Sequence, residues 1–350
     1  MFALAFGEAL IKHRARCRLS LIRDLQALTK PRLLLITAIL APIADMTVFP
    51  AIFVIIGPTA SGKSALAMSL AERFGAEILS VDSMQIYRGM DIGTAKPTRD
   101  EQARVRHHLI DVAEPTESFA VSRFVEMADA AIADAASRNV PLIATGGTPM
   151  YYKALFEGLF EGPSADAKVR ESLGANTNEQ LHEQLTKVDP ASASRIHVND
   201  RKRLVRALEV FELTGKPISS MQEQWQGEMA RHAAKWFGID WEKETLNRRI
   251  NARVKQMIAE GWVEETRRVL DAHGELSKTA SEATGYHELI EHVRGRMSLD
   301  DAAEQIKIAT RQLARRQMKW FRRFPGVEWM RGEEGIEALG QQVIATVKDA

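Results

Sequence analysis

The fold is decided by one stretch, Ile52-Phe53-Val54-Ile55-Ile56 followed by Gly57-Pro58-Thr59-Ala60-Ser61-Gly62-Lys63-Ser64. The apolar, β-branched run predicts a strand buried on both faces, and residues 65–71 after the loop predict a helix. The loop matches G-x-x-x-x-G-K-[ST] in the strand, loop and helix context that a phosphate-binding loop requires. Its backbone N–H groups would converge on phosphate oxygens, with Lys63 on a terminal phosphate and Ser64 on Mg²⁺. We therefore expect a bound di- or triphosphate rather than a glycine-rich turn that merely joins two elements.

Composition narrows the class of protein further. The 350 residues are 45% hydrophobic and 27% charged, which is typical of a globular protein with two domains or one domain with insertions. Because 47 basic residues balance 46 acidic ones, the net charge by itself identifies no partner. A lone cysteine, Cys17, excludes an internal disulfide and a cysteine zinc site, which fits a reducing compartment. We expect a cytoplasmic protein.

Residues 1–45 do not resemble part of the fold. They are rich in Lys and Arg, and an apolar run, 33–41, is too short to span a bilayer. This run could belong to a signal or transit peptide, but the basic region before it is long for a secretory signal. We expect an extension that is disordered or comes from a start site placed too early, with Met46 as the true start, and no membrane attachment.

A second predicted strand, 77–81, ends in Asp82-Ser83. Ligands of open parallel α/β sheets lie beyond the carboxyl ends of the strands, so Asp82 should arrive beside the phosphate loop. A carboxylate there can be a magnesium ligand, a general base or a helix N-cap. The polar, glycine-punctuated residues 85–97 that follow predict a functional loop.

The pattern of strand and helix then continues. It predicts a short strand at 107–112, an amphipathic helix at 119–138, a buried strand at 140–145 and a helix that begins near Met150 after Gly146-Gly147-Thr148-Pro149. We expect His107 and His108 to be packing and surface residues rather than metal ligands, since no other ligand stands at suitable spacing. This alternation predicts an α/β fold, a doubly wound parallel sheet of the P-loop NTPase type.

The sheet pattern stops after residue 155. Short helices at 167–173 and 178–187 predict a small helical insertion at 156–199, and the core should return at 200–335 before a C-terminal tail at 336–350. The basic first turn of the helix after Asn199-Asp200 indicates an anionic partner, because cations disfavour a helix start. A solvated charged face is the alternative. In a later helix, 242–260, Arg249 and Arg253 share a face, although surface pairing is an equal alternative for Arg249.

A second concentration of positive charge lies near the end of the chain. Six cations alternate there with apolar and aromatic residues on a predicted helix: Arg311, Arg315, Arg316, Lys319, Arg322 and Arg323, with Leu313, Met318, Trp320 and Phe321. Cations meet phosphates and aromatic rings stack on bases in nucleic-acid interfaces. The aromatic residues can equally be core, and we expect them to be buried.

Several of these blocks together carry a family resemblance. In order along the chain they are GPTASGKS, SVDSMQIYRGMDIGTAKP, HHLIDV, GGTPMYYKAL, NDRKRLVRALEV with TGKP, ATGYHEL and TRQLARRQMKW. This set is similar to bacterial tRNA dimethylallyltransferases, also called tRNA isopentenyltransferases, from about residue 49 to 329. The resemblance implies transfer of a dimethylallyl group from dimethylallyl diphosphate to the adenosine 3′-adjacent to the anticodon, position 37, with Mg²⁺ and the tRNA anticodon arm as partners. An ATP site is commonly attributed to the loop by its motif.

The resemblance also implies roles for individual residues. Catalytic roles fall on Asp82, Thr148 and Lys63, and diphosphate binding falls on the loop Gly57 to Ser64 and on Arg253. Contacts to tRNA fall on Asp82, Ser83, Met84, Gln85, Thr148, Arg170, Lys202, Arg203, Leu204, Val205, Arg206, Arg315, Arg316, Gln317, Lys319, Trp320 and Arg322. Ser64 would hold Mg²⁺, and a monomer is expected.

Three other activities stay open at this point. One is a P-loop small-molecule kinase, which would need ATP and an acceptor pocket under a mobile lid. The chain has no N-K-x-D motif of the kind with which G proteins read their base, and no convincing second acidic magnesium site of the kind expected of an NTPase. Another is an adenylate isopentenyltransferase, against which the insertion and the basic helix argue. The last is a nucleotide-dependent RNA-binding switch.

Overall fold

The computed structural model describes residues 52–158, 162–163, 165–222 and 231–348. The expected extension at 1–45 and the start at Met46 lie outside these ranges. None of the described helices is both long and apolar enough to cross a membrane.

One six-stranded sheet forms the centre of the protein. All its neighbouring strands pair in parallel, in the order β3-β2-β4-β1-β5-β6. The strands are β1 (Ile52–Ile56), β2 (Glu77–Ser80), β3 (His107–His108), β4 (Leu142–Thr145), β5 (Lys235–Asp240) and β6 (Val327–Arg331). Every residue of β1 is buried, as its unbroken apolar run requires. The predicted parallel α/β sheet is confirmed.

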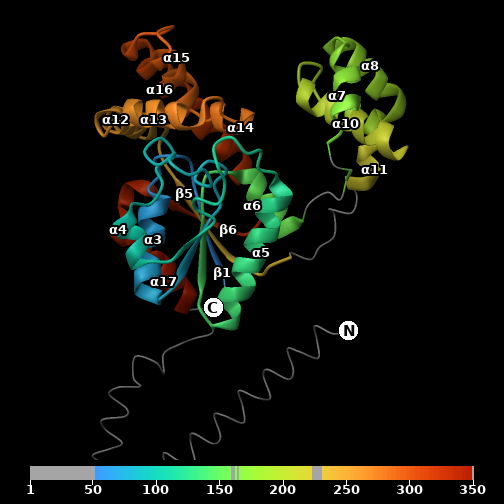
Figure 1. Cartoon of the computed structure of the whole chain (residues 1–350). Coiled ribbons are helices and arrows are strands. Elements are labelled where there is room, and N and C mark those ends of the chain that lie inside the picture. Colours follow the sequence, from blue (N-terminus) through green and yellow to red (C-terminus); the bar gives the residue numbers. More distant parts are fainter. Residues whose placement is uncertain (1–51, 159–161, 164, 223–230, 349–350) are drawn as a thin grey trace, which may run out of the picture. The chain divides into compact units, whose positions relative to one another are not determined.

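Four helices cover the two faces of this sheet. They are α3 (Lys63–Phe74), α4 (Arg99–Arg104), α5 (Val121–Ser137) and α6 (Pro149–Glu157). In Figure 1, α3 and α4 lie on one face, and α5 and α6 lie on the other. The chain leaves β1 toward β2 on one side and returns from β4 to β5 on the other, so β1 and β4 flank the topological switch point. Ligand sites of such sheets form beyond the strand ends at this point.

Helices from the second half of the chain lie beyond the carboxyl ends of the strands (Figure 1). They are α12 (Lys243–Ala259), α13 (Trp262–His273), α14 (Lys278–Ser281), α15 (Tyr286–Val293) and α16 (Leu299–Phe321). Helix α16 packs on α12, α15 and α6 and so joins this layer to the sheet region. A 3₁₀ turn (Gly332–Glu334) and α17 (Ile336–Lys348) follow β6, so the stretch expected to be a tail is mostly helical.

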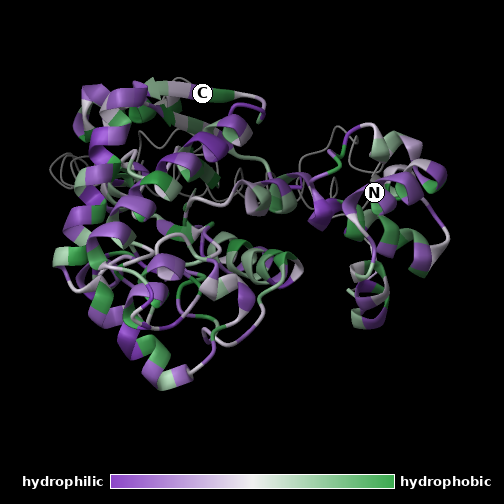
Figure 2. Ribbon diagram, turned by 90° about the horizontal axis from the view of Figure 1, so that it is seen from above, coloured by the Kyte–Doolittle hydropathy of each residue, from purple (hydrophilic) through white to green (hydrophobic). Residues whose placement is uncertain are grey.

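The helical insertion is larger than the sequence indicated. It contains α7 (Ala167–Gly174), α8 (Asn178–Val188), α9 (Pro190–Ala193), α10 (Arg201–Thr214) and α11 (Ile218–Gln222). Leu173, Leu185 and Leu204 belong to one buried cluster of this unit. Because α10 contributes to that cluster, we place the end of the insertion after α11 instead of at 199. Its helices alternate between hydrophilic and hydrophobic segments in Figure 2, as amphipathic helices do.

Candidate active site

A cavity of about 230 Å³ opens at the carboxyl ends of the central strands. The phosphate loop, the ends of β2 and β4, and helices α12 and α16 all contribute to its wall. Polar lining groups include Thr59, Lys63, Asp82, Gly147, Arg253 and Gln317. The structure therefore brings together residues that are up to 258 positions apart in the sequence.

Side chains from outside the motif hold the phosphate loop in its curled conformation. Ala60 has a left-handed φ of 63°, which is uncommon for a residue other than glycine. The Arg249 Nε–H donates to the carbonyl of Ala60 across 2.9 Å, and the Trp241 indole N–H donates to the carbonyl of Ser61 across 2.9 Å. The Arg249 guanidinium also lies 4.2 Å from the centre of the Trp241 ring. Arg249 thus supports the loop rather than pairing with an acid at the surface.

Two cations face the cavity without carboxylate partners in the described ranges. Lys63 Nζ makes one long contact, 3.4 Å, with the carbonyl oxygen of Pro58. Burial, with the nearby Arg253 as a second cause, lowers the pKa of Lys63 to about 8. Burial also lowers the pKa of Arg253, whose guanidinium forms no hydrogen bond or ion pair with another described residue. A bound polyanion would stabilise such enclosed and unpaired cations.

Asp82 joins the ends of two strands. One carboxylate oxygen accepts the Met84 N–H at 2.9 Å, and the other accepts the Gly147 N–H at 3.1 Å. The N-cap alternative for Asp82 is wrong, because the next helix, α4, begins at Arg99 and is capped by Thr98. The Asp82 carboxylate is held instead by a local turn and by the glycine turn after β4.

Thr148 is linked to the residue after Asp82. Its hydroxyl oxygen accepts the Ser83 N–H at 2.9 Å, and its O–H lies 3.1 Å from Ser83 Oγ. Thr148 is therefore bonded to Ser83, the residue that follows Asp82 of the cavity wall.

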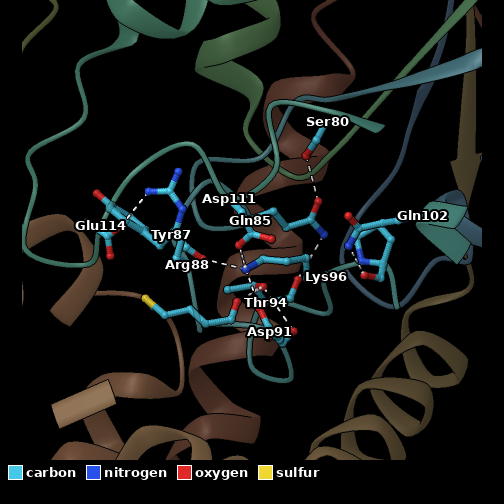
Figure 3. A network of polar contacts seen from close by, with 12 residues as sticks. Ser80, Gln85, Tyr87, Arg88, Asp91, Thr94, Lys96, Gln102, Asp111 and Glu114 are labelled. Carbon is cyan, nitrogen blue, oxygen red and sulfur yellow. Dashed lines mark hydrogen bonds and ion pairs between the residues drawn. The ribbon is translucent and has the colours of Figure 1, made fainter. Parts of the chain in front are cut away.

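Polar side chains from the loop at 85–97 and from the residues around it order this loop (Figure 3). The Gln85 amide accepts from the Ser80 hydroxyl at 2.8 Å and donates to the Ala95 carbonyl at 3.0 Å. Buried Lys96 forms ion pairs with Asp91 at 2.5 Å and Asp111 at 2.6 Å. Both ends of the Gln85 side chain are thus used inside the protein, which disfavours the predicted contact of this amide with tRNA.

A buried acid from α13 completes the support of this loop. Glu265 accepts the backbone N–H groups of Asp91, Ile92 and Gly93 at 3.0, 2.8 and 3.2 Å, and the Tyr286 hydroxyl at 2.5 Å. No pattern in the sequence indicates the roles of Glu265 and Trp241 or the packing role of Lys96. An acid within an amphipathic helix gives no local signal of burial, and only the fold shows what it faces.

Ser64 is exposed at the first turn of α3, and its hydroxyl has no hydrogen-bond partner among the described residues. Within the same ranges no group of three or more His, Cys, Asp or Glu side chains could hold a metal ion. Mg²⁺ commonly takes most of its ligands from water and substrate phosphates. A single free hydroxyl beside an anion site fits a magnesium ion that arrives with a diphosphate.

The histidines of β3 have partners within the protein. His108 Nε2 lies 2.7 Å from the Glu77 carboxylate, which also pairs with Arg138 at 2.6 Å. The His107 ring contacts the Val105 carbonyl oxygen at 2.8 Å. Both rings therefore have polar partners within the protein.

The residues predicted to bind tRNA from the insertion divide into two groups. Arg170 and Arg206 form ion pairs with the buried Glu209 at 2.8 and 2.7 Å, although Arg170 keeps 48% of its side chain exposed. Lys202 and Arg203 are exposed. The prediction for Leu204 is wrong: this side chain is fully buried in the insertion's own core, and Val205 packs partly against the same cluster. The helical period turns Leu204 inward while its charged neighbours face solvent.

Helix α16 also has two different faces. Arg315, Arg316 and Lys319 are exposed and form no ion pair with another described residue, whereas Arg322 pairs with Asp240 at 2.9 Å. On the other side, Phe321 is buried and Trp320 is half-buried, which confirms core packing for Phe321 and supports it only in part for Trp320.

Gln317 belongs to the buried side of this helix. It is only 4% exposed, and its amide contacts Thr59 and Gly147. Each polar end of the side chain already has a partner inside the protein, and this placement disfavours the predicted contact of Gln317 with tRNA.

Family models match most of the described core. A model described as IPP transferase matches residues 85–324, and one described as isopentenyl transferase matches residues 50–118. A tRNA dimethylallyltransferase from Geobacter metallireducens is 48% identical over 278 residues, covering 78% of this chain and 90% of the relative. One from Geobacillus thermodenitrificans is 46% identical over 283 residues, covering 79% and 89%.

Solved structures show the same likeness. A tRNA isopentenylpyrophosphate transferase from Staphylococcus epidermidis superposes with a TM-score of 0.63 at 34% identity, covering 86% of this chain and 99% of the other. A eukaryotic dimethylallyltransferase described as acting on tRNA gives a TM-score of 0.69 at 26% identity, covering 80% and 73%.

Proposed function

The chain belongs to the IPP transferase family, and from this premise we propose that it transfers a dimethylallyl group from dimethylallyl diphosphate to tRNA. The acceptor is the exocyclic amine of the adenosine 3′-adjacent to the anticodon, position 37. One observation carries the proposal: a single cavity holds the carboxylate of Asp82 together with Lys63 and Arg253, two cations that form no ion pair with any residue the structure describes. This alkyl transfer needs positive charge that stabilises the anionic leaving group, and a base that accepts a proton from the amine.

Asp82 acts as the general base in this proposal. The amine nitrogen forms a bond to the allylic carbon, the bond from that carbon to the diphosphate oxygen breaks, and diphosphate leaves with the electron pair. The amine proton passes to the Asp82 carboxylate. Because backbone N–H groups hold both carboxylate oxygens, the base is oriented before the substrate arrives. Thr148 and Ser83 lie beside it and would contact the reacting base.

Charge that develops on the leaving diphosphate is stabilised by the other end of the cavity. Lys63 and Arg253 supply positive charge, and the N–H groups of the curled loop supply donors. Ser64 would hold a Mg²⁺ ion that arrives with the diphosphate, and this ion would add positive charge at the leaving group.

Two surfaces support binding of the tRNA anticodon arm. The exposed cations of α16, Arg315, Arg316 and Lys319, form no ion pair within the described ranges and are available for phosphate contacts. On the insertion, Lys202 and Arg203 are exposed, and Arg170 and Arg206 retain exposed surface beyond their pairing with Glu209. The target adenosine must leave the anticodon stack to reach the cavity, as in other enzymes that modify a base.

The setting of the enzyme follows from its proposed substrate. We propose that it works in the cytoplasm, where tRNA is modified, and as a monomer, since one chain supplies every group of the described cavity. Sedimentation at micromolar concentration tests the monomer.

The decisive experiment analyses nucleosides by mass spectrometry. Bulk tRNA that lacks the modification is incubated with the protein, Mg²⁺ and dimethylallyl diphosphate, and a parallel reaction contains the Asp82→Asn variant. We expect dimethylallyl-adenosine in the first reaction and little in the second. Absence of the product, with ATP consumed when it is supplied, would instead favour a kinase.

A further inference from the structure

Gln317 connects two parts of the active site that come from different strands. The Thr59 N–H in the phosphate loop donates to Gln317 Oε1 at 2.8 Å. Gln317 Nε2 donates to the Gly147 carbonyl oxygen at 2.6 Å. Because the side chain is 4% exposed, both bonds are shielded from water and compete with no solvent partner.

The contact on the β4 side leads directly to the base. The carbonyl of Gly147 accepts from Gln317, and the N–H of the same glycine donates to Asp82 at 3.1 Å. A Cβ atom at position 147 would lie 2.7 Å from Gln317 Nε2 and 3.1 Å from Asp82 Oδ2, so a larger residue would force these groups apart. Four residues, Thr59, Gln317, Gly147 and Asp82, thus form one continuous chain of hydrogen bonds.

We propose that Gln317 is a positioning residue that fixes the phosphate loop relative to Asp82, and hence the distance from donor diphosphate to general base. This inference rests on the proposed function. In an alkyl transfer the phosphate loop holds the donor and the general base contacts the acceptor amine. A displacement of about 1 Å between these two groups of the protein would reduce the rate by about a hundredfold. Thr59 and Gly147 belong to loops after different strands, β1 and β4, and the Gln317 amide bonds to both.

The position of Gln317 separates this role from tRNA binding. Its neighbours Arg316 and Lys319 face solvent on the same helix, α16, whereas Gln317 faces the cavity. One face of the helix is therefore available to tRNA phosphates and the other holds the site. Substitution of Gln317 should change the chemistry and the binding of dimethylallyl diphosphate, and leave the affinity for tRNA almost unchanged.

Two variants test the proposal. Gln317→Glu keeps the shape and the acceptor for Thr59, but the carboxylate cannot donate to the Gly147 carbonyl and repels it. Gln317→Met keeps most of the volume and removes both hydrogen bonds without adding charge. For each variant we expect kcat to fall about tenfold to a hundredfold and KM for dimethylallyl diphosphate to rise, with the tRNA Kd within about twofold of wild type. Gln305→Glu, an exposed position on the same helix, is the matched control and should behave like wild type.

The outcomes distinguish this inference from the proposed function. Wild-type protein that forms no dimethylallyl-adenosine contradicts the proposed function. If wild type is active, a Gln317 variant with normal kcat and normal KM for the donor overturns the positioning role. A variant with weaker tRNA binding and normal kcat at saturating tRNA also overturns it, because Gln317 would then be a tRNA contact. Melting temperatures are measured for both variants, and the Met variant carries the test if the Glu variant does not fold.

Discussion

The backbone N–H of Gly147 donates a hydrogen bond of 3.1 Å to the carboxylate of Asp82. This bond links the end of β4 to the end of β2, two neighbouring parallel strands. The sequence places both residues after strands, but it does not show that a main-chain donor orients the acid. An acid fixed in this way loses little conformational freedom when the substrate amine arrives.

Replacement of Asp82 by Asn should abolish most of the turnover. The oxygen of the new amide can still accept one N–H, but it cannot take up the amine proton. Its NH₂ group would face the backbone N–H of Met84 or of Gly147, which places two donors against each other. We expect kcat to fall by about a hundredfold or more, the size of a general-base contribution, in single-turnover assays with saturating tRNA. The affinity for tRNA, measured by filter binding, should change little. Turnover equal to wild type would mean that Asp82 has only a structural role.

The low pKa of Lys63 predicts that diphosphate binding depends on pH. Only the protonated amine attracts the anion, and binding must raise its pKa above the value of about 8 in the free protein. The affinity for inorganic diphosphate should therefore be greatest below pH 8 and fall as the pH rises through that value. Calorimetric titrations between pH 7 and 9.5 measure this change.

The matched control for this titration is Lys63→Arg. A guanidinium stays protonated over the range, so the ratio of wild-type to variant affinity isolates the ionisation of Lys63 from that of diphosphate itself. A ratio that does not change with pH contradicts the assignment. Arg253→Gln should move the decline in affinity to higher pH, because Arg253 is one cause of the low pKa of Lys63.

The exposed cations of α16 should contribute to tRNA binding through phosphate contacts. Arg316→Ala is expected to weaken the affinity and to reduce the slope of log K against log salt by about one contact. Arg322→Ala is the comparison, since Arg322 is already paired with Asp240 and should have a smaller effect on the slope. Binding isotherms at several salt concentrations measure both. Equal slopes for wild type and Arg316→Ala would remove this residue from the interface.

Two neighbours on α10 should behave in opposite ways. Leu204→Ala leaves a cavity in the core of the insertion and should cost about 2–5 kcal/mol of stability of that unit. Arg203→Ala, on the exposed face, should change stability by less than about 0.5 kcal/mol and weaken tRNA binding instead. Thermal unfolding combined with filter binding separates the two effects. A Leu204→Ala protein of normal stability would contradict the buried placement.

Local chemistry made much of the fold predictable. The strand, loop and helix around Lys63, the alternation that gives a parallel sheet, and the placement of Asp82 beside the phosphate loop follow from short patterns. The direction in which a helical side chain points was harder to predict from the sequence. Leu204 and Gln317 lie within strongly basic segments, where the pattern indicates nucleic-acid binding, yet both face inward because a helix presents its residues to opposite sides.

By itself the sequence determined the kind of site: a loop that binds phosphate, an acid at the next strand end and a basic helix near the end of the chain. Tertiary structure decided how that site is held. Arg249 and Trp241 fix the loop, Glu265 fixes the segment after Asp82, and Gln317 bonds to residues 258 and 170 positions away. These contacts leave no local periodicity or motif, because each depends on which strands and helices become neighbours once the apolar surfaces are buried.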